Sequence, residues 1–332
     1  MKDTVRIGVV GIDHRHIYTM AGHLIDQGAH LVAFATDGDP GTLPGWQKRF
    51  PDAPRWQEDD IISAPDIDLV LTAGVPSDRA SVACRAMEAG KDVLSDKPGC
   101  LTIRDLETLR ETATRTGRIW SVDFSERFEV PGVTLASELV AAGEIGRVVH
   151  TLGIGPHRLN AATRPDWFWK REQNGGILAD IGAHQIDQFL HFTGSEDAMV
   201  VHASAHCIAR EGFQDVGQMT LQSGDATGYV KLDWFTPDAM PTWGDGRLFL
   251  TGTEGTIEIR KYADVGGQPG GDHVFLTNGT RSERFDASNA GLPFFGRLLE
   301  DVLNRSETAH SRAHPFTVMR LAIEAQEMAE AC

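Results

Sequence analysis

The chain has 332 residues, of which 41% are hydrophobic and 23% charged, so it is long enough for about two globular domains and is not a disordered chain. Its 47 acidic and 31 basic residues give a net charge of −16, which excludes the basic surface of a nucleic-acid-binding protein and disfavours anionic membranes as partners. No apolar run reaches the ~18 residues that indicate a membrane span.

Residues 5–124 alternate between short apolar runs and helical patterns. We expect strands at 5–10, 31–35, 67–72, 92–95 and 119–124, and helices at 16–25, 77–88 and 103–116. Strands that alternate with helices of this length pair in parallel through crossover helices. The first part of the chain is therefore predicted to form a doubly wound parallel sheet.

The second part of the chain has a different pattern. After a helix expected at 133–142, strand-like runs follow at 148–154, 199–208, 216–221, 227–235, 248–251, 256–259 and 273–277, and helices at 293–304 and 315–331. Glycine and aspartate turn signals separate the strands, which is typical of an antiparallel sheet. The boundary falls near residue 123, giving expected domains of 1–122 and 123–332.

A partial dinucleotide-binding motif follows the first expected strand. Such a domain carries G-x-G-x-x-G there, whereas residues 8–16 read GVVGIDHRH, so Gly11 is present but Asp13 and His16 replace the next two glycines. A carboxylate ~4 Å from a pyrophosphate costs about 4 kcal/mol at an effective dielectric of ~20. Asp13 could instead cap the first helix, or the basic residues beside it could hold the phosphate differently. A metal role for His14 and His16 is a lesser alternative.

Two further residues follow expected strands. Asp37, after the second strand, stands where an acid binds ribose hydroxyls and disfavours a 2′-phosphate, although a plain Asp-Gly turn is the alternative. Lys97, in Asp96-Lys97-Pro98, follows the fourth strand, so it should point into the ligand-binding crevice of a parallel sheet. A lysine there can stabilise an alkoxide, although a surface turn is the ordinary explanation.

The most specific pattern is residues 175–187, GGILADIGAHQID. One helix would place Asp180, His184 and Asp187 on one face, where a histidine and an acid can exchange and orient protons. Gly182 costs ~1 kcal/mol inside a helix, so a close neighbour should need the space. A single metal ion cannot reach both Asp180 and His191, because that span is about 16 Å. A charged helix face is the ordinary alternative.

Together these motifs resemble the Gfo/Idh/MocA family, which includes glucose–fructose oxidoreductase and inositol dehydrogenase. The likeness covers nearly the whole chain and includes residues 37–40 (DGDP), 87–91 (MEAGK), 97–102 and 142–146 (AGEIG). It implies an N-terminal Rossmann domain, and a C-terminal α/β domain whose open, mostly antiparallel sheet often makes oligomer contacts. It also implies hydride transfer between NAD(P) and a sugar, cyclitol or related polyol.

The resemblance also assigns residues. Lys97 matches the active-site lysine, His184 the acid/base, and Asp180 the substrate-binding acid, while Asp187 is expected to be structural. The implied cofactor-binding residues are Gly8, Gly11, Ile12, Asp13, His14, Asp37 and Lys97. Three features depart from the family pattern: the two replaced glycines, Asp96 in place of the usual glutamate, and Arg79 where a histidine is common.

We therefore expect an NAD-dependent dehydrogenase, with NADP the less favoured cofactor and no resident metal, that forms a homodimer or homotetramer through the C-terminal sheet. Arg164, Trp167 and Trp169 precede the 175–187 segment and are candidate substrate contacts, or part of an ordinary amphipathic loop. The alternative functions are a non-redox lyase, isomerase or metal-assisted hydrolase on the same scaffold, and a non-catalytic ligand sensor.

The expected location is cytoplasmic. Residues 1–10 lack the pattern of a secretory signal. Cys84, Cys100, Cys207 and Cys332 are scattered without a CxxC motif, which is typical of free thiols in a reducing compartment.

Overall fold

The computed structural model describes residues 4–331, and these divide into two compact units. Unit 1 comprises the described residues up to Asp123 together with Pro165–Gly175 and Pro293–Met319. Unit 2 comprises Phe124–Arg164, Gly176–Leu292 and the described residues from Arg320 onward. Residues 1–3, part of the segment 1–10 that was searched for a secretory signal, lie outside the described residues, and so does Cys332.

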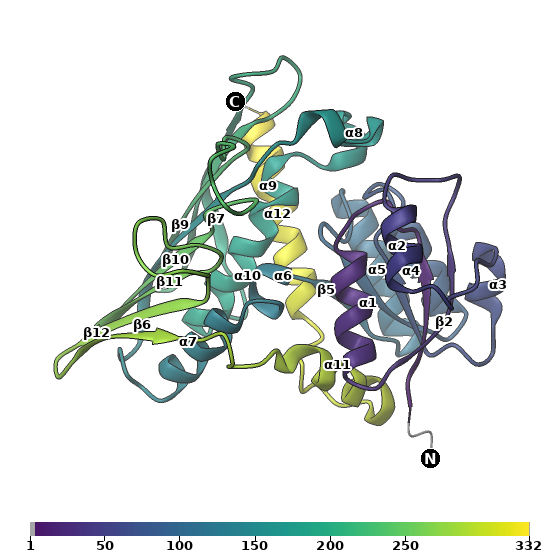
Figure 1. The fold of residues 1–332 in the computed structure, drawn as a ribbon, viewed down its shortest axis with the longest axis horizontal. Helices are drawn as coiled ribbons and strands as arrows, with labels where there is room; N and C mark the ends of the chain where they lie inside the picture. Colours follow the sequence, from purple (N-terminus) through teal and green to yellow (C-terminus); the bar gives the residue numbers. More distant parts are fainter. Residues whose placement is uncertain (1–3, 332) are drawn as a thin grey trace. The chain divides into compact units, whose positions relative to one another are not determined.

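Unit 1 contains a five-stranded parallel sheet in the order β2-β1-β3-β4-β5. Its two edge strands, β2 and β5, are labelled in Figure 1. Its strands are β1 (Arg6–Val10), β2 (His30–Ala35), β3 (Leu69–Thr72), β4 (Asp92–Asp96) and β5 (Trp120–Asp123). All residues of β3, β4 and β5 are buried, as in a sheet covered by helices on both faces. The predicted doubly wound sheet is confirmed.

The helices of unit 1 are α1 (Ile17–Asp26), α2 (Leu43–Arg49), α3 (Glu58–Ser63), α4 (Arg79–Glu88), α5 (Ile103–Thr116), η2 (Asp166–Trp169), α8 (Arg171–Asn174) and α11 (Pro293–Asn304); α12 (His314–Glu330) continues into unit 2. The boundaries of α5 and α11 match the sequence prediction. Thr102 caps α5 by accepting from the amide of Asp105, and Gly117 ends it in the left-handed conformation. The short helices α2 and α3 were not predicted, because Pro44 and Gly45 in α2 obscure a helical pattern.

Unit 2 contains an eight-stranded sheet in the order β13-β12-β11-β10-β6-β9-β8-β7. Its strands are β6 (Val148–Pro156), β7 (Met199–His206), β8 (Val216–Ser223), β9 (Ala226–Asp233), β10 (Arg247–Gly252), β11 (Gly255–Arg260), β12 (His273–Asn278) and β13 (Ser282–Asp286). All neighbouring strands are antiparallel except β6 and β9, because the chain enters a helical segment after β6 and returns at β7. The mostly antiparallel sheet was predicted; β13 was missed because its sequence, SERFD, shows no apolar alternation.

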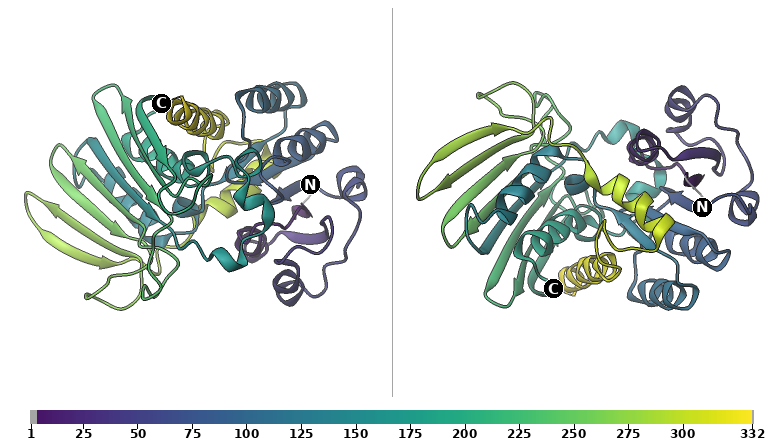
Figure 2. Two further views of the ribbon diagram at one scale, coloured as in Figure 1. Left: turned by 90° about the horizontal axis from the view of Figure 1, so that it is seen from above. Right: turned by 90° about the horizontal axis from the view of Figure 1, so that it is seen from below.

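The helices of unit 2 are α6 (Ser125–Phe128), α7 (Pro131–Ala141), η1 (Ala161–Thr163), α9 (Ile177–Asp180) and α10 (Gly182–Thr193). Helices α7, α9 and α10 contact strands of the sheet and cover one of its faces (Figure 2). Among the described residues of unit 2, no helix lies on the other face. Alternate residues of β11, such as Ile257 and Ile259, face α7 and are at most 1% exposed. No helix among the described residues is long and apolar enough to cross a membrane.

Candidate cofactor-binding and catalytic sites

The loops after β1 and β3 meet where the strand order of unit 1 reverses. The amide of His14 donates to the carbonyl of Ala73 (2.9 Å), and that of Ala73 donates to the carbonyl of Gly11 (3.2 Å). Gly11 has a φ of +78°, and a Cβ there would lie 2.6 Å from the Cα of Gly74. Parallel sheets bind dinucleotides at this reversal, and small residues let backbone approach a pyrophosphate. The two glycine-containing loops therefore fit a dinucleotide.

Asp13 does not cap α1, so that interpretation of the sequence is wrong. The helix begins at Ile17, and its capping residue, His16, makes no side-chain capping hydrogen bond. Burial raises the pKa of Asp13, the charge of Arg79 lowers it, and the carboxylate of Asp37 raises it further. The Asp13 carboxylate is thus held in an unfavourable environment beside a second acid.

Asp37 follows β2 on an exposed loop. Arg55 holds this loop by donating to the carbonyls of Thr36 and Gly38 and to the carboxylate of Asp39. Residues 37 and 38 form a bend in which Gly38 has a φ of +55°, and no hydrogen bond ties the Asp37 carboxylate to this bend among the described residues. The exposed carboxylate of Asp37 suits ribose hydroxyls.

His14 and His16 share the buried carboxylate of Asp96 at the end of β4. Their Nδ1 atoms lie 2.6 and 2.9 Å from the two carboxylate oxygens, and Arg79 donates to the same carboxylate at 3.1 Å. Burial raises the pKa of Asp96, but Arg79 and the two histidines hold it well below its usual value. Burial also lowers the pKa of His14 to about 4, against the pull of Asp96.

These three side chains are the metal-ligating cluster that the described residues offer. Arg79 argues against a metal there, because this buried guanidinium already neutralises Asp96 and would repel a dication. Arg79 also donates to the carbonyls of Asp96, Lys97 and Pro98. The cluster therefore serves to fix the loop that carries Lys97.

Lys97 belongs to unit 1 and is only 4% exposed. Of the candidate substrate contacts, Trp167 and Trp169 flank buried Phe168 on η2 in unit 1. Arg164 belongs to unit 2, where its guanidinium lies 4.9 Å from the Trp234 ring centre.

The predicted 175–187 helix is two helices in unit 2, α9 and α10, with only Ile181 between them. Asp180 ends α9, and His184, 1% exposed, lies in the first turn of α10. A Cβ at Gly182 would lie 2.6 Å from Cε of Met219, so Gly182 has the close neighbour that was predicted.

Side chains at both ends hold this helical segment. Gln326 on α12 accepts from the amide of Leu178 at 3.0 Å, and a Cβ at Gly176 would collide with its amide group. Asp187, fully buried, accepts two hydrogen bonds from Arg127 on α6 at 2.6 and 2.7 Å. This ion pair explains why a carboxylate stands at the buried position 187.

Glu126, beside Arg127 on α6, was missed by sequence reasoning. Its Oε2 atom accepts from Nζ of Lys261 at 2.6 Å and from Nε2 of Gln185, the neighbour of His184, at 2.7 Å. Both charged residues are 1% exposed. No local signal identifies the pair, because Glu126 and Lys261 are separated by 135 residues.

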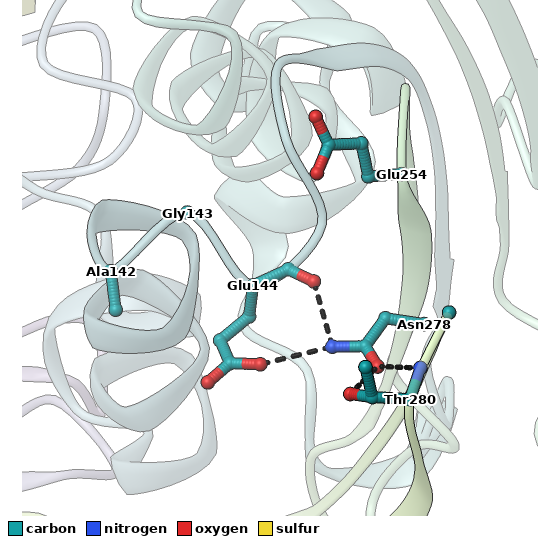
Figure 3. Close-up of a pocket in the computed structure, with 7 residues that line it drawn as sticks. Ala142, Gly143, Glu144, Glu254, Asn278 and Thr280 are labelled. Atoms are coloured by element: carbon teal, nitrogen blue, oxygen red, sulfur yellow. Dashed lines mark hydrogen bonds between the residues drawn. The ribbon is translucent and has the colours of Figure 1, made fainter.

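A hollow of about 490 Å³ lies elsewhere in unit 2 (Figure 3). The end of α7 and the turns before β11 and β13 line it. The side-chain amide of Asn278 donates to the backbone carbonyl and the carboxylate of Glu144. The hydroxyl of Thr280 donates a hydrogen bond to Oδ1 of Asn278. None of the predicted site residues lines this hollow.

Two family models match the chain. Residues 5–124 match "Oxidoreductase family, NAD-binding Rossmann fold", and residues 133–258 match "GFO/IDH/MocA C-terminal domain". An oxidoreductase structure from Erwinia carotovora atroseptica is 42% identical, with a TM-score of 0.94 over 98% of both chains. A levoglucosan dehydrogenase complex with NADH and levoglucosan has a TM-score of 0.82 at 18% identity, over 99% of this chain and 98% of that one, which shows the fold alone.

The curated relatives include scyllo-inositol 2-dehydrogenase (NAD(+)) of Bacillus subtilis, 29% identical over 78% of this chain and 75% of that protein. D-xylose dehydrogenase of Paenarthrobacter nicotinovorans is 28% identical over 54% of this chain. The matched stretch spans about half the length of several relatives, including 47% of the xylose enzyme. None of these named relatives is a lyase or hydrolase, so the non-redox alternative has no support.

Proposed function

Because the chain belongs to the Gfo/Idh/MocA oxidoreductase family, we propose that it transfers a hydride between NAD and a hydroxyl-bearing carbon of a sugar, cyclitol or related polyol. The observation that carries the proposal is the close approach of Gly11 and Gly74 where the parallel sheet reverses, with Asp37 exposed beside it. The relatives that act on inositol and xylose support the substrate class.

The chain's own groups have separate roles in this proposal. NAD, when bound, supplies the hydride acceptor. His184 accepts the hydroxyl proton at an imidazole nitrogen, while Lys97 donates a hydrogen bond to a substrate oxygen and stabilises negative charge on it. Asp180 accepts a hydrogen bond from a substrate hydroxyl. Trp167, Trp169 and Arg164 remain candidate substrate contacts.

Asp37 supports NAD over NADP. Its carboxylate accepts hydrogen bonds from ribose hydroxyls, whereas a 2′-phosphate beside it is repelled. Gly8, Gly11, Ile12, Asp13, His14 and Lys97 are the other proposed cofactor-side residues. His14 and Asp13 act mainly on the shape and charge of the loop.

The test begins with calorimetric titration of NAD⁺, NADH, NADP⁺ and NADPH, followed by a polyol and sugar screen that records NADH formation. We expect NAD binding that His184→Ala leaves within twofold, and turnover that this variant reduces at least 100-fold. Absence of nucleotide binding in the folded wild type, or full turnover in His184→Ala, contradicts the proposal.

We also propose that the sheet of unit 2 joins copies of the chain into a dimer or tetramer. Met199, Val201 and Tyr229 on β7 and β9 are 61%, 50% and 37% exposed, and apolar side chains of this size often mark an interface. Light scattering during gel filtration tests this, and a monomer at micromolar concentration contradicts it.

A cytoplasmic location is supported by the free thiols of Cys84, Cys100 and Cys207. Fractionation of the native host tests it, and recovery from an extracytoplasmic fraction contradicts it.

A further inference from the structure

The ion pair of Glu126 and Lys261 is buried in unit 2, as is His184. Burying two charges is costly, and replacement by apolar residues often leaves stability unchanged or improves it. The pair therefore calls for an explanation beyond stability. Glu126 lies on α6, which packs against α10, and it bonds the side chain directly after His184.

The two oxygens of Glu126 have different surroundings. Oε2 accepts from both Lys261 and Gln185, whereas buried Oε1 has no hydrogen-bond partner among the described residues. An unsatisfied buried acceptor lowers the stability of the folded state. Such an oxygen is suited to stabilise a positive charge that exists for only part of a reaction cycle.

The positive groups that act on Glu126 are the candidates for that cation. Burial raises the pKa of Glu126, but the positive charges of Lys261, His184 and His157 lower it to about 2, so the carboxylate stays ionised. Lys261 forms an ion pair with Glu126 at 2.6 Å. His184 and His157 carry imidazole groups, the side-chain type that ordinarily gains and loses a proton near neutral pH.

We propose that Glu126 and Lys261 are positioning residues that hold α10 through Gln185 and stabilise the protonated form of His184. Glu126 favours the imidazolium, and Lys261 limits that effect so that His184 still releases its proton. The inference rests on the proposed role of His184 as the proton acceptor. It adds a charge pair that tunes this group without touching substrate.

The signature is a pair of opposite shifts. Removing the negative charge with Glu126→Gln leaves Lys261 facing His184, so the pKa of His184 falls. Removing the positive charge with Lys261→Met leaves Glu126 unbalanced, so the pKa of His184 rises. A purely structural pair has no reason to shift the titration in opposite directions.

The experiment is a ¹³C–¹H NMR titration of the full chain labelled at histidine, with the signal of His184 assigned by its loss in His184→Asn. We expect shifts of about one unit or more, a tenfold change in the protonation constant, downward in Glu126→Gln and upward in Lys261→Met. The matched control is Asp301→Asn, which removes a buried carboxylate in unit 1 and should leave the titration unchanged.

The double variant Glu126→Gln/Lys261→Met covers the case in which a single variant does not fold. It removes both charges and keeps similar volumes, and His184 should then titrate below its wild-type value but above that in Glu126→Gln. Titration within 0.2 unit of wild type in this variant, or single variants that shift in the same direction, overturns the proposal.

The other charged groups on α10 and the elements packed on it stay unchanged in these variants: Arg127 on α6, Asp180 on α9, His150 on β6, Lys231 and Asp233 on β9, and Asp187 and His191 on α10. His157, which follows β6, also acts on Glu126, so its signal is followed separately from that of His184. The titration uses no substrate, so its failure leaves the proposed function standing. Full turnover in His184→Ala would instead remove the proposed function, whatever the titration shows.

Discussion

Substitution of Gly11 by alanine tests how rigidly the two loops of unit 1 are joined. The added Cβ would lie 2.6 Å from Cα and 2.8 Å from N of Gly74, and backbone atoms cannot move aside as a flexible side chain can. A positive φ costs alanine roughly 1–2 kcal/mol, and overpacking against fixed atoms adds about 1–3 kcal/mol. We therefore expect Gly11→Ala to lose about 2–5 kcal/mol of unfolding free energy.

Gly117→Ala is the matched control in the same unit. Gly117 has a φ of +66°, but no heavy atom lies within 4 Å of its added Cβ. This variant should lose only the backbone part, roughly 1–2 kcal/mol. The difference between the two variants isolates the contact with Gly74.

Urea denaturation, monitored by circular dichroism, measures the loss of unfolding free energy in both variants. Calorimetry measures their NAD binding. Gly11→Ala should weaken NAD binding at least tenfold because it separates the loops, whereas Gly117→Ala should leave binding within twofold. Equal losses of stability and unchanged NAD affinity would show that the loops yield easily, and would refute the reasoning.

Three further changes test the polar groups. Arg79→Met should cost about 3–5 kcal/mol, because it leaves buried Asp96 without its guanidinium partner, and a loss below 1 kcal/mol in urea denaturation contradicts this. Asp13→Asn should raise the free energy of unfolding at pH 7, because the raised pKa of Asp13 means that its ionised form is disfavoured in the folded state. This gain in unfolding free energy should disappear as the pH falls through the raised pKa of Asp13, and a pH-independent gain would argue against the reasoning. Arg127→Met should also cost about 3–5 kcal/mol, and the double variant with Asp187→Leu should recover most of it, whereas additive losses would mean that the two residues act independently.

The sequence predicted those parts of the fold that have a local periodic pattern. The α5 helix has a threonine cap at its start and a glycine at its end, and both of its predicted boundaries agree with the structure. The β13 strand is polar and was missed, because its place is determined by antiparallel pairing with β12. The parallel pairing of β6 with β9 joins distant segments and has no local signal.

The same distinction holds for the candidate sites. The sequence identified Asp180, His184 and Asp187 by their spacing, and the fold explains Asp187 through Arg127. It misassigned Asp13 as a possible helix cap, since the cap position depends on the path of the loop between β1 and α1. Lys261 could not be assigned, because only the fold brings it to Glu126.

The bond between Gln326 and the amide of Leu178 has a consequence for the order in which the protein is made. The two residues are 148 positions apart, so α9 lacks this partner until α12 has been synthesised. At ~5–20 residues per second, translation of that interval takes about 7–30 s. The neighbouring amide of Ile177 has an earlier partner, the side-chain oxygen of Gln214, at 3.3 Å. The segment carrying Asp180 and His184 therefore receives its contacts in two stages, and the bond from Leu178 to Gln326 is the later one.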